Sequence, residues 1–149
     1  MVTDVEALEG LGRRLGHTFK DRTLLLRALT HSSYANEHSG ERDNGALAFL
    51  GDAVLALVVG EHVWRAHPDE PEGLLTPRRA ELVSGANLAL WATALEMGPL
   101  LQLGRGEEQM GGRGKESLLA TALEAVLGVI YLEGGLEAAR RAVAALAPW

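Results

Sequence analysis

The sequence predicts an all-α fold, for three reasons. Apolar residues recur three and four positions apart through most of the 149 residues, which is the helical period. No segment alternates apolar and polar residues as a half-buried strand does. Glycine and proline are grouped at intervals that would separate helices of ordinary length. The apolar fraction is 47%, enough for a packed core, and we expect a single domain over residues 1–149.

The first elements are two short helices. Thr3 and Glu6 fit a capping box, and the leucines that follow share one helical face until Gly16 ends the helix. Asp21 or Thr23 is placed to cap a second helix.

The middle of the chain predicts a loop and then a long apolar helix. Residues 32–43 are polar and contain glycine, which favours a loop. A helix is expected over residues 45–66, because its apolar pattern is unbroken until Pro68. Thr76 and Pro77 form a suitable N-cap and first helical position, so the next helix should begin there.

The C-terminal half predicts three helices and one loop. The helix that opens at Pro77 should end before the Gly98–Pro99 pair. Residues 103–115 are rich in glycine and predict a loop. A further helix should run over residues 117–133, and a last amphipathic helix over residues 136–146.

Cysteine content and the N-terminus bear on location. The chain has no cysteine, which suits a reducing compartment. Its first residues lack the basic, apolar and small-residue succession of a signal peptide. The longest apolar run, near residues 47–60, is interrupted by Asp52 and is too short to span a bilayer. We therefore expect a soluble, cytoplasmic protein with no membrane partner.

The charge balance bears on the class of partner. The formal net charge is −6. Because sequence-independent binding to nucleic acid depends largely on Lys and Arg at phosphates, this balance argues against a broad basic surface. It is compatible with a local basic patch, and it suits a metal site built from clustered carboxylates.

One acid stands alone on the long apolar helix. In "NGALAFLGDAVLALVV", residues 44–59, Asp52 follows a glycine, and the positions one and two turns earlier hold Ala48 and Gly45. From the residue pattern alone, such an aspartate is best explained as a hydrogen-bonding partner of a neighbouring helix or loop.

Three blocks of the sequence together resemble the endonuclease domain of ribonuclease III. They are "LLLRALTHSSYANE", "FLGDAVLALVVGEHVW" and "GRGKESLLATALEAVLGVIYLEGG", and the resemblance extends over residues 6–147. It implies an all-α, dimeric fold that cuts double-stranded RNA. In such a reaction Mg²⁺ activates a water and neutralises charge on the leaving oxygen. We expect the double-stranded-RNA-binding domain that often follows in the family to be absent, because the sequence ends at Trp149.

The resemblance assigns metal-binding acids to two helices, and most of them are replaced here. The family pattern N-E-x-L-E-F-L-G-D reads NGALAFLGD, so Gly45 and Ala48 stand where the family has glutamates. In the later helix Thr121 takes the place of an aspartate, whereas Glu124 is kept. Asp52 is kept as well, so the catalytic cluster that the family implies is reduced to a remnant.

The retained acids are the candidate catalytic and metal-binding residues. Asp52 and Glu124 should face one another across the cleft, and Glu72 matches a further, more weakly placed family acid. So few carboxylates hold Mg²⁺ weakly, and the missing charges lower the attraction for a cation. We expect Mg²⁺ to bind weakly or not at all and the protein to be catalytically impaired or inactive, a pseudoenzyme.

Phe49 is the candidate for a subunit contact. The resemblance places this residue at the dimer interface, where it fills a cavity on the partner, whereas by pattern alone it would be a core aromatic. A homodimer is expected both from the resemblance and because two-fold dimers are the commonest oligomers. A heterodimer with an active relative is also compatible with the sequence.

The candidate RNA-binding residues are basic. Arg113 and Lys115 lie just before a predicted helix, where phosphate contacts are easily made. Arg78 and Arg79, together with Arg105, could extend an RNA-facing patch. The alternative for all of them is ordinary surface charge on mobile segments.

Three functions therefore stay open. We favour a non-catalytic, dimeric relative of ribonuclease III that acts on or with double-stranded or structured RNA in RNA processing. The second is an active Mg²⁺-dependent endoribonuclease that uses the reduced acid set. The third is a protein-interaction module without a role in RNA, which the acidic net charge favours over a tight RNA binder.

Overall fold

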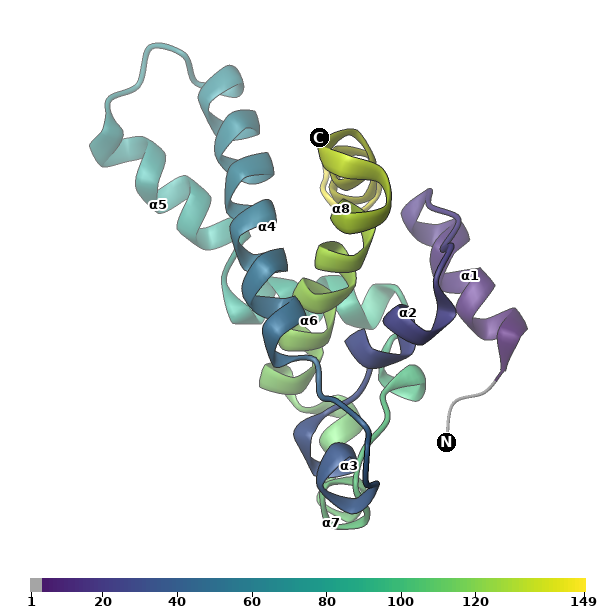
Figure 1. The fold of residues 1–149 in the computed structure, drawn as a ribbon. Coiled ribbons are helices and arrows are strands. Elements are labelled where there is room, and N and C mark those ends of the chain that lie inside the picture. The colour runs from purple at the N-terminus through teal and green to yellow at the C-terminus, as the bar shows by residue number, and fades with distance from the viewer. Residues whose placement is uncertain (1–3) are drawn as a thin grey trace.

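The computed structural model describes residues 4–149, and the architecture of this part is all-α, as the sequence predicts (Figure 1). Within it the backbone forms one isolated bridge, between Thr30 and Gln102, and no strand. The elements are α1 (Val5–Leu15), α2 (Arg22–Ala28), α3 (Ser32–Glu37), α4 (Gly45–Ala66), α5 (Glu72–Leu82), α6 (Gly85–Ala94), η1 (Gly98–Leu100), α7 (Arg105–Gln109), η2 (Gly112–Gly114) and α8 (Glu116–Leu146).

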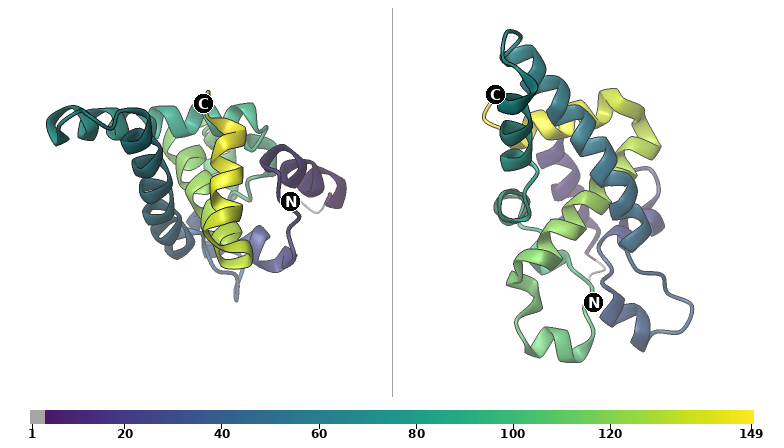
Figure 2. Two further views of the ribbon diagram at one scale, coloured as in Figure 1. Left: turned by 90° about the horizontal axis from the view of Figure 1, so that it is seen from above. Right: turned by 90° about the vertical axis from the view of Figure 1, so that its left-hand side faces the viewer.

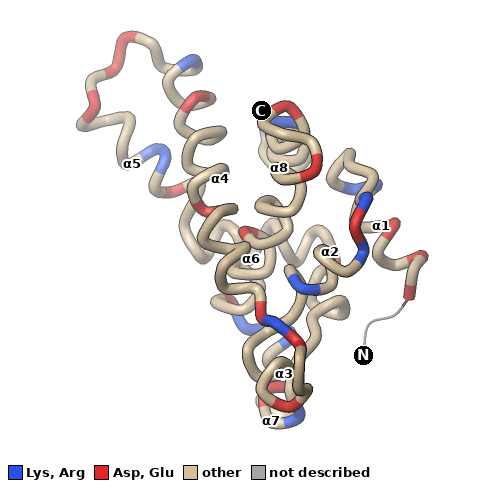
Figure 3. The backbone as a smooth tube through the Cα atoms, in the orientation of Figure 1, with Lys and Arg blue, Asp and Glu red and all other residues tan. Residues whose placement is uncertain are grey.

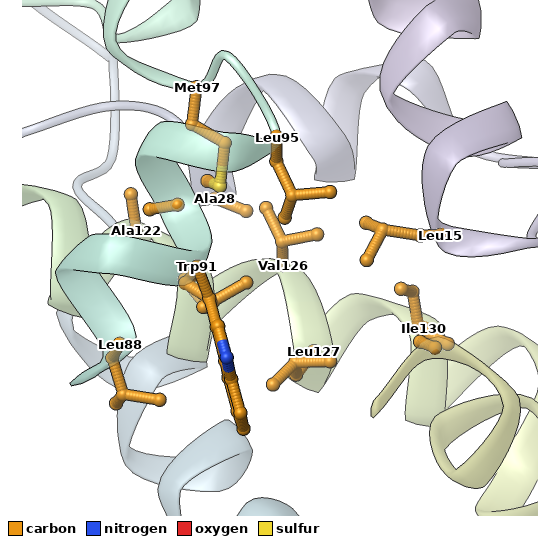
Figure 4. Close-up of a cluster of buried hydrophobic side chains, with 14 of the residues drawn as sticks. Leu15, Ala28, Leu88, Trp91, Leu95, Met97, Ala122, Val126, Leu127 and Ile130 are labelled. Carbon is orange, nitrogen blue, oxygen red and sulfur yellow. The ribbon is translucent and has the colours of Figure 1, made fainter. Parts of the chain in front are cut away.

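Helix α8 lies at the centre, with α4 crossing one side and α1, α2 and α6 packed around the others (Figures 1 and 2). The core forms where apolar faces meet on α8, for example where Trp91 of α6 lies close to Leu127 (Figure 4). Leu11, Leu55, Leu123, Val126 and Ile130 are fully buried there. The prediction of a single domain over residues 1–149 stays a prediction.

The backbones of α4 and α8 touch where they cross. A Cβ atom on Gly51 would overlap the carbonyl oxygen of Glu124, and one on Gly128 would lie 2.6 Å from the carbonyl oxygen of Leu47. Only glycine allows two helices to approach so closely. The crossing therefore explains the glycine in "FLGD" and the one in "EAVLGV".

The predicted end of α1 at Gly16 and the predicted cap of α2 at Asp21 are confirmed, whereas α1 begins at a different cap. Asp4 caps α1 by accepting hydrogen bonds from the backbone N–H groups of Glu6 and Ala7, whereas the predicted cap, Thr3, lies outside the described residues. Gly16 ends α1 in the left-handed conformation, with φ of 65°. Asp21 caps α2 through the N–H of Leu24, which selects it over Thr23.

Two predicted loops contain helices. Residues 32–43 were expected to form a loop, but Ser32–Glu37 form α3, which His31 caps through the N–H of Ser33. The predicted loop 103–115 includes α7 and η2. The two segments are held together, because Ser33 Oγ accepts a hydrogen bond from the backbone N–H of Gly104 at 2.8 Å. Tertiary contacts thus order segments whose composition suggests loops.

The helix predicted to begin at Pro77 is two helices. Helix α5 already begins at Glu72 and contains Pro77, so the predicted cap at Thr76 is wrong. The chain then breaks at Ser84, whose hydroxyl accepts from the N–H of Asn87 and opens α6. An N-cap can interrupt an apolar run that would otherwise look continuous.

Helix α5 extends away from the bundle. It is joined to the end of α4 and projects from the other helices in two directions of view (Figures 1 and 2). None of its residues is buried, and Leu74 is exposed. A helix without buried side chains gains little from packing within its own chain.

Helix α8 bends at the predicted glycine pair. Gly135 has φ of 71° and ψ of −167°, which separates the segment before it from a last segment ending at Leu146. Directly before the bend, the buried Glu133 accepts from His17 Nε2 at 2.8 Å and from the backbone N–H groups of Lys20 and Asp21. Glu133 thereby holds the turn between α1 and α2 against α8.

Among the described residues, α4 and α8 are long and apolar enough to cross a membrane by length and composition. This corrects the expectation that no apolar segment has sufficient length. The protein itself buries 44% of the apolar window in α4 and 56% of that in α8. Core helices of a soluble protein pass the same test, so this property does not by itself indicate a membrane.

Candidate functional site

The crossing of α4 and α8 brings Asp52 and Glu124 together. Asp52 follows Gly51 on α4 and is exposed, whereas Glu124 on α8 is half-buried. Burial first, and then a hydrogen bond with Asp52 and the charge of Asp52, raise the pKa of Glu124 to about 7. Near neutral pH Glu124 therefore holds a proton much of the time and donates it to a carboxylate oxygen of Asp52. The two acids face one another, as the sequence predicts.

The positions around this pair offer no further carboxylate. Gly45 is the exposed first residue of α4, Ala48 is buried one turn before Asp52, and Thr121 is half-buried one turn before Glu124. Within residues 4–149, no group of three or more His, Cys, Asp or Glu side chains is arranged to hold a metal ion. Mg²⁺ prefers several oxygen ligands in near-octahedral geometry, so the residues present fit this ion poorly.

Glu72 does not join the Asp52–Glu124 pair in this chain. It is the exposed first residue of α5 and lines a groove between α4 and α5, together with Trp64 and Arg79. Within the described residues, Glu72 also belongs to no group of three or more His, Cys, Asp or Glu side chains that could hold a metal ion. Its prediction as a metal ligand thus gains no support from the geometry of one chain.

Arg113 has a structural task. Its Nη1 donates to the carbonyl oxygens of Gly98 at 3.1 Å and Leu101 at 2.6 Å, while its Nη2 lies 2.6 Å from a carboxylate oxygen of Glu108. The guanidinium therefore holds the segment before α8 against η1. A side chain so occupied is less available to a phosphate than the sequence suggests.

Two more of the predicted RNA-binding cations are paired with acids. Arg78 forms two hydrogen bonds with Glu70, at 2.7 and 2.8 Å, and Lys115 Nζ lies 2.9 Å from Glu107. Arg79 has no ion pair among the described residues. Figure 3 shows the basic residues scattered over the fold rather than gathered in one stripe. Such an arrangement favours weak attraction for nucleic acid.

An exposed apolar stripe runs along α4. Phe49 is 81% exposed, Leu57 54% and Trp64 59%, and their spacing places them on one helical face. Phe49 is therefore not a core aromatic. Next to the far end of the stripe lies the groove between α4 and α5, about 520 Å³ in volume and lined by Leu57, Trp64 and Leu75 among others. Exposed apolar stripes of this kind are typical of protein interfaces.

A protein-family model described as ribonuclease-III-like matches residues 21–147, which is most of the chain. The chain belongs to the ribonuclease III family. The family resemblance of its motifs is thereby confirmed.

Curated relatives of this ribonuclease III family member carry the name ribonuclease 3. That of Caldanaerobacter subterraneus subsp. tengcongensis is 48% identical over 134 residues, covering 89% of this chain and 59% of the relative. That of Streptomyces coelicolor is 52% identical over 136 residues, covering 91% and 48%. That of Pseudomonas aeruginosa is 49% identical over 143 residues, covering 95% and 60%. The chain thus spans about half to three fifths of the length of these relatives.

Solved structures of the family share the fold. The nuclease domain of ribonuclease III from Campylobacter jejuni superposes with a TM-score of 0.86 at 41% identity, covering 93% of this chain and 95% of that one. That structure is described for flexibility in a region involved in dimer formation. Dicer from Pichia stipitis superposes with a TM-score of 0.59 at 28% identity, covering 80% and 50%.

The exposed stripe on α4 of this ribonuclease III relative was only partly foreseen. Phe49 is the residue of this stripe that the sequence analysis singles out, whereas Trp64 and the α4–α5 groove were not predicted. A usable signal was present, because α4 carries apolar residues on all sides over residues 49–64. A helix that is apolar all round must be covered on every side, by its own chain or by a partner.

Proposed function

We propose that this protein is a dimeric ribonuclease III relative that acts on or with double-stranded or structured RNA, with impaired or absent cleavage. One observation supports impaired cleavage: the acids at the crossing of α4 and α8 are Asp52 and Glu124, and Glu124 has a pKa of about 7. A carboxyl group that holds a proton near neutral pH is a poor ligand for Mg²⁺.

The raised pKa of Glu124 follows first from burial and then from the hydrogen bond and charge of Asp52. Where the family carries acids at the positions of Gly45, Ala48 and Thr121, a bound cation would offset the mutual repulsion of the carboxylates. In this chain the pair relieves that repulsion by keeping a proton. The proposal is that the fold and the dimer have been retained, whereas the metal-binding half of the site has not.

The dimer proposal rests on the stripe of α4. Phe49 projects from this helix with 81% of its surface exposed, and the groove between α4 and α5 is mostly apolar. In a two-fold dimer every contact occurs twice, with the two subunits exchanged. Phe49 of each subunit would therefore enter the α4–α5 groove of its partner. The same contact would cover Trp64 and give α5 the packing that it lacks in a single chain.

An active endoribonuclease is the second candidate, and a specific observation favours it. The relatives at 48–52% identity carry the name ribonuclease 3, and the chain covers 48–60% of their length. On this proposal Asp52 and Glu124 would hold a metal with the help of oxygen atoms of the RNA. The comparisons thus favour activity, whereas the chemistry of the site favours its loss.

A cleavage assay with a restored variant distinguishes the two candidates. The triple variant Gly45→Glu, Ala48→Glu, Thr121→Asp is compared with the natural chain on double-stranded RNA, with Mg²⁺ or Mn²⁺. We expect cleavage from the restored variant alone, and its further change Glu124→Gln should abolish that cleavage. Circular dichroism checks each fold, because Ala48 is buried.

Two results would overturn the favoured proposal. Cleavage by the natural chain that is lost in Asp52→Asn would establish the active alternative. Firm dimerisation with no retention of double-stranded RNA at low salt would point to a protein-interaction module instead. A titration of Mn²⁺ by electron paramagnetic resonance supplies a readout besides activity, and we expect tighter binding by the restored variant.

A further inference from the structure

A second hollow of the molecule lies away from the α4–α8 crossing. It is formed by α1, the turn over residues 16–20 and the beginning of α2, and its volume is about 510 Å³. Leu8, Phe19 and Leu25 are among the apolar residues that line it. This size is within the usual range for sites that bind small molecules.

The hollow is rimmed mainly by positive charge. Arg13, Lys20 and Arg22 line it, and Glu9 is the acid among its lining residues. In a chain with a net charge of −6, three cations to one acid is a local reversal of the overall balance. Such a concentration of cations around one concave surface attracts anions.

These cations are not neutralised by the protein itself. Within residues 4–149, the side chains of Arg13 and Arg22 make no hydrogen bond or ion pair, although other arginines such as Arg78 and Arg140 are paired with glutamates. Lys20 Nζ contacts a neutral group, the carbonyl oxygen of Glu133, at 3.4 Å. The hollow therefore offers uncompensated donors to a ligand.

The turn over residues 16–20, which carries Lys20 and forms one wall of the hollow, is held in place by Glu133. The carboxylate of Glu133 accepts from the backbone N–H groups of Lys20 at 3.0 Å and Asp21 at 2.9 Å, and from His17 Nε2 at 2.8 Å. The His17 and Glu133 side chains are 6% and 7% exposed. Phe19 packs its ring edge-on against His17, with centroids 4.9 Å apart. Because these contacts already fix the turn over residues 16–20, a ligand that binds the hollow does not have to order this segment.

We propose that this hollow binds a small phosphorylated ligand with an aromatic or apolar body, of the size of a nucleoside monophosphate. The cations would meet the phosphate, and Leu8, Phe19 and Leu25 would contact the body of the ligand. A duplex is a poorer fit, because its phosphates follow an extended path whereas these cations surround a single concave volume. The site is separate from Asp52 and Glu124 and from the dimer stripe.

Calorimetric titration of the full chain with adenosine monophosphate, inorganic phosphate and adenosine tests the proposal. We expect adenosine monophosphate to bind most tightly, since it alone supplies both the anion and the apolar body. The double variant Arg13→Ala, Arg22→Ala should weaken this binding by about tenfold or more, as two charge-assisted contacts are lost. Glu9→Gln should strengthen it by about two- to threefold, because one repulsive charge is removed.

Arg42→Ala is the matched control, since Arg42 is an exposed arginine that does not line the hollow. It should leave the affinity unchanged. The proposal is overturned if adenosine monophosphate shows no saturable binding, if adenosine binds as tightly, or if Arg42→Ala weakens binding as much as the double variant. It is also overturned if the double variant loses retention of duplex RNA while no mononucleotide binds, which would make these arginines part of an RNA surface.

Discussion

Gly51 of α4 lies directly against the backbone carbonyl of Glu124 in α8, leaving no room for a Cβ atom between the two helices. This contact places the next residue, Asp52, beside the Glu124 side chain. The geometry of the remnant site is thus a consequence of how closely two core helices approach.

Gly51→Ala should destabilise the fold strongly. The added methyl group would overlap the Glu124 carbonyl, so α4 and α8 would have to separate along the core, at a cost of about 3 kcal/mol or more. Urea denaturation measures the change. Gly73→Ala in α5 is the control, because no atom lies within 4 Å of its added Cβ. That variant should be neutral or slightly more stable, since alanine favours a helix. Equal stability of Gly51→Ala and the natural chain would contradict the close crossing.

Glu124→Gln should change how stability depends on pH. Because the pKa of Glu124 is raised to about 7 in the fold, its contribution is fully present below its unfolded value of 4.5 and is lost as the pH rises through 7. The natural chain should therefore lose about 1–2 kcal/mol relative to Glu124→Gln between pH 5 and pH 8, after allowance for solvent screening. Denaturation at each pH measures this, and parallel curves for the two proteins would refute a protonated pair.

Glu133→Ala should destabilise the packing of α1 and α2 on α8. It leaves His17 Nε2 and the backbone N–H groups of Lys20 and Asp21 without their acceptor, at a cost of about 2–4 kcal/mol. Glu137→Ala on the same helix is the control, because the Glu137 side chain is 84% exposed and its ion pair contributes little. Urea denaturation compares the two, and similar small losses in both would argue against the role given to Glu133.

Acid should weaken the same contact. Burial alone would raise the pKa of Glu133, but hydrogen bonds from His17 and the two backbone N–H groups outweigh it and lower the pKa below its ordinary value of 4.5. A lowered carboxyl pKa contributes stability above the ordinary value, and the contribution is lost as the pH falls through the folded value. The difference in stability between the natural chain and Glu133→Ala should accordingly shrink below pH 4.5.

Phe49→Glu should dissociate the proposed dimer without unfolding the subunit. Phe49 is 81% exposed, so the chain itself loses little packing, whereas a charge in an apolar interface is costly to bury. Leu90→Glu on α6 is the matched control, since Leu90 is also apolar and 69% exposed but lies outside the α4 stripe. Sedimentation velocity should report a monomer for Phe49→Glu and a dimer for Leu90→Glu. A monomeric natural chain would contradict the dimer proposal.

Part of the fold could be read from local signals. The long helix over residues 45–66 has the predicted bounds, because an apolar pattern and a following proline define it without outside help. Gly16 and Gly135 end or bend helices as predicted, since glycine readily adopts positive φ. The helix α3 was missed, because its order depends on contacts such as that of Ser33 with Gly104, which is distant in sequence.

For the candidate site as well, some properties could be predicted from the sequence and others depend on tertiary contacts. By itself the sequence determined which acids are present and which are replaced, and family motifs indicated that Asp52 and Glu124 belong together. Only the tertiary structure decided that Arg113 is occupied with backbone carbonyls and that Phe49 is exposed. It also decided that burial beside Asp52 raises the pKa of Glu124 to about 7. The physical reason is that identity and spacing are local properties, whereas exposure, pairing and proton affinity depend on residues brought together from distant parts of the chain.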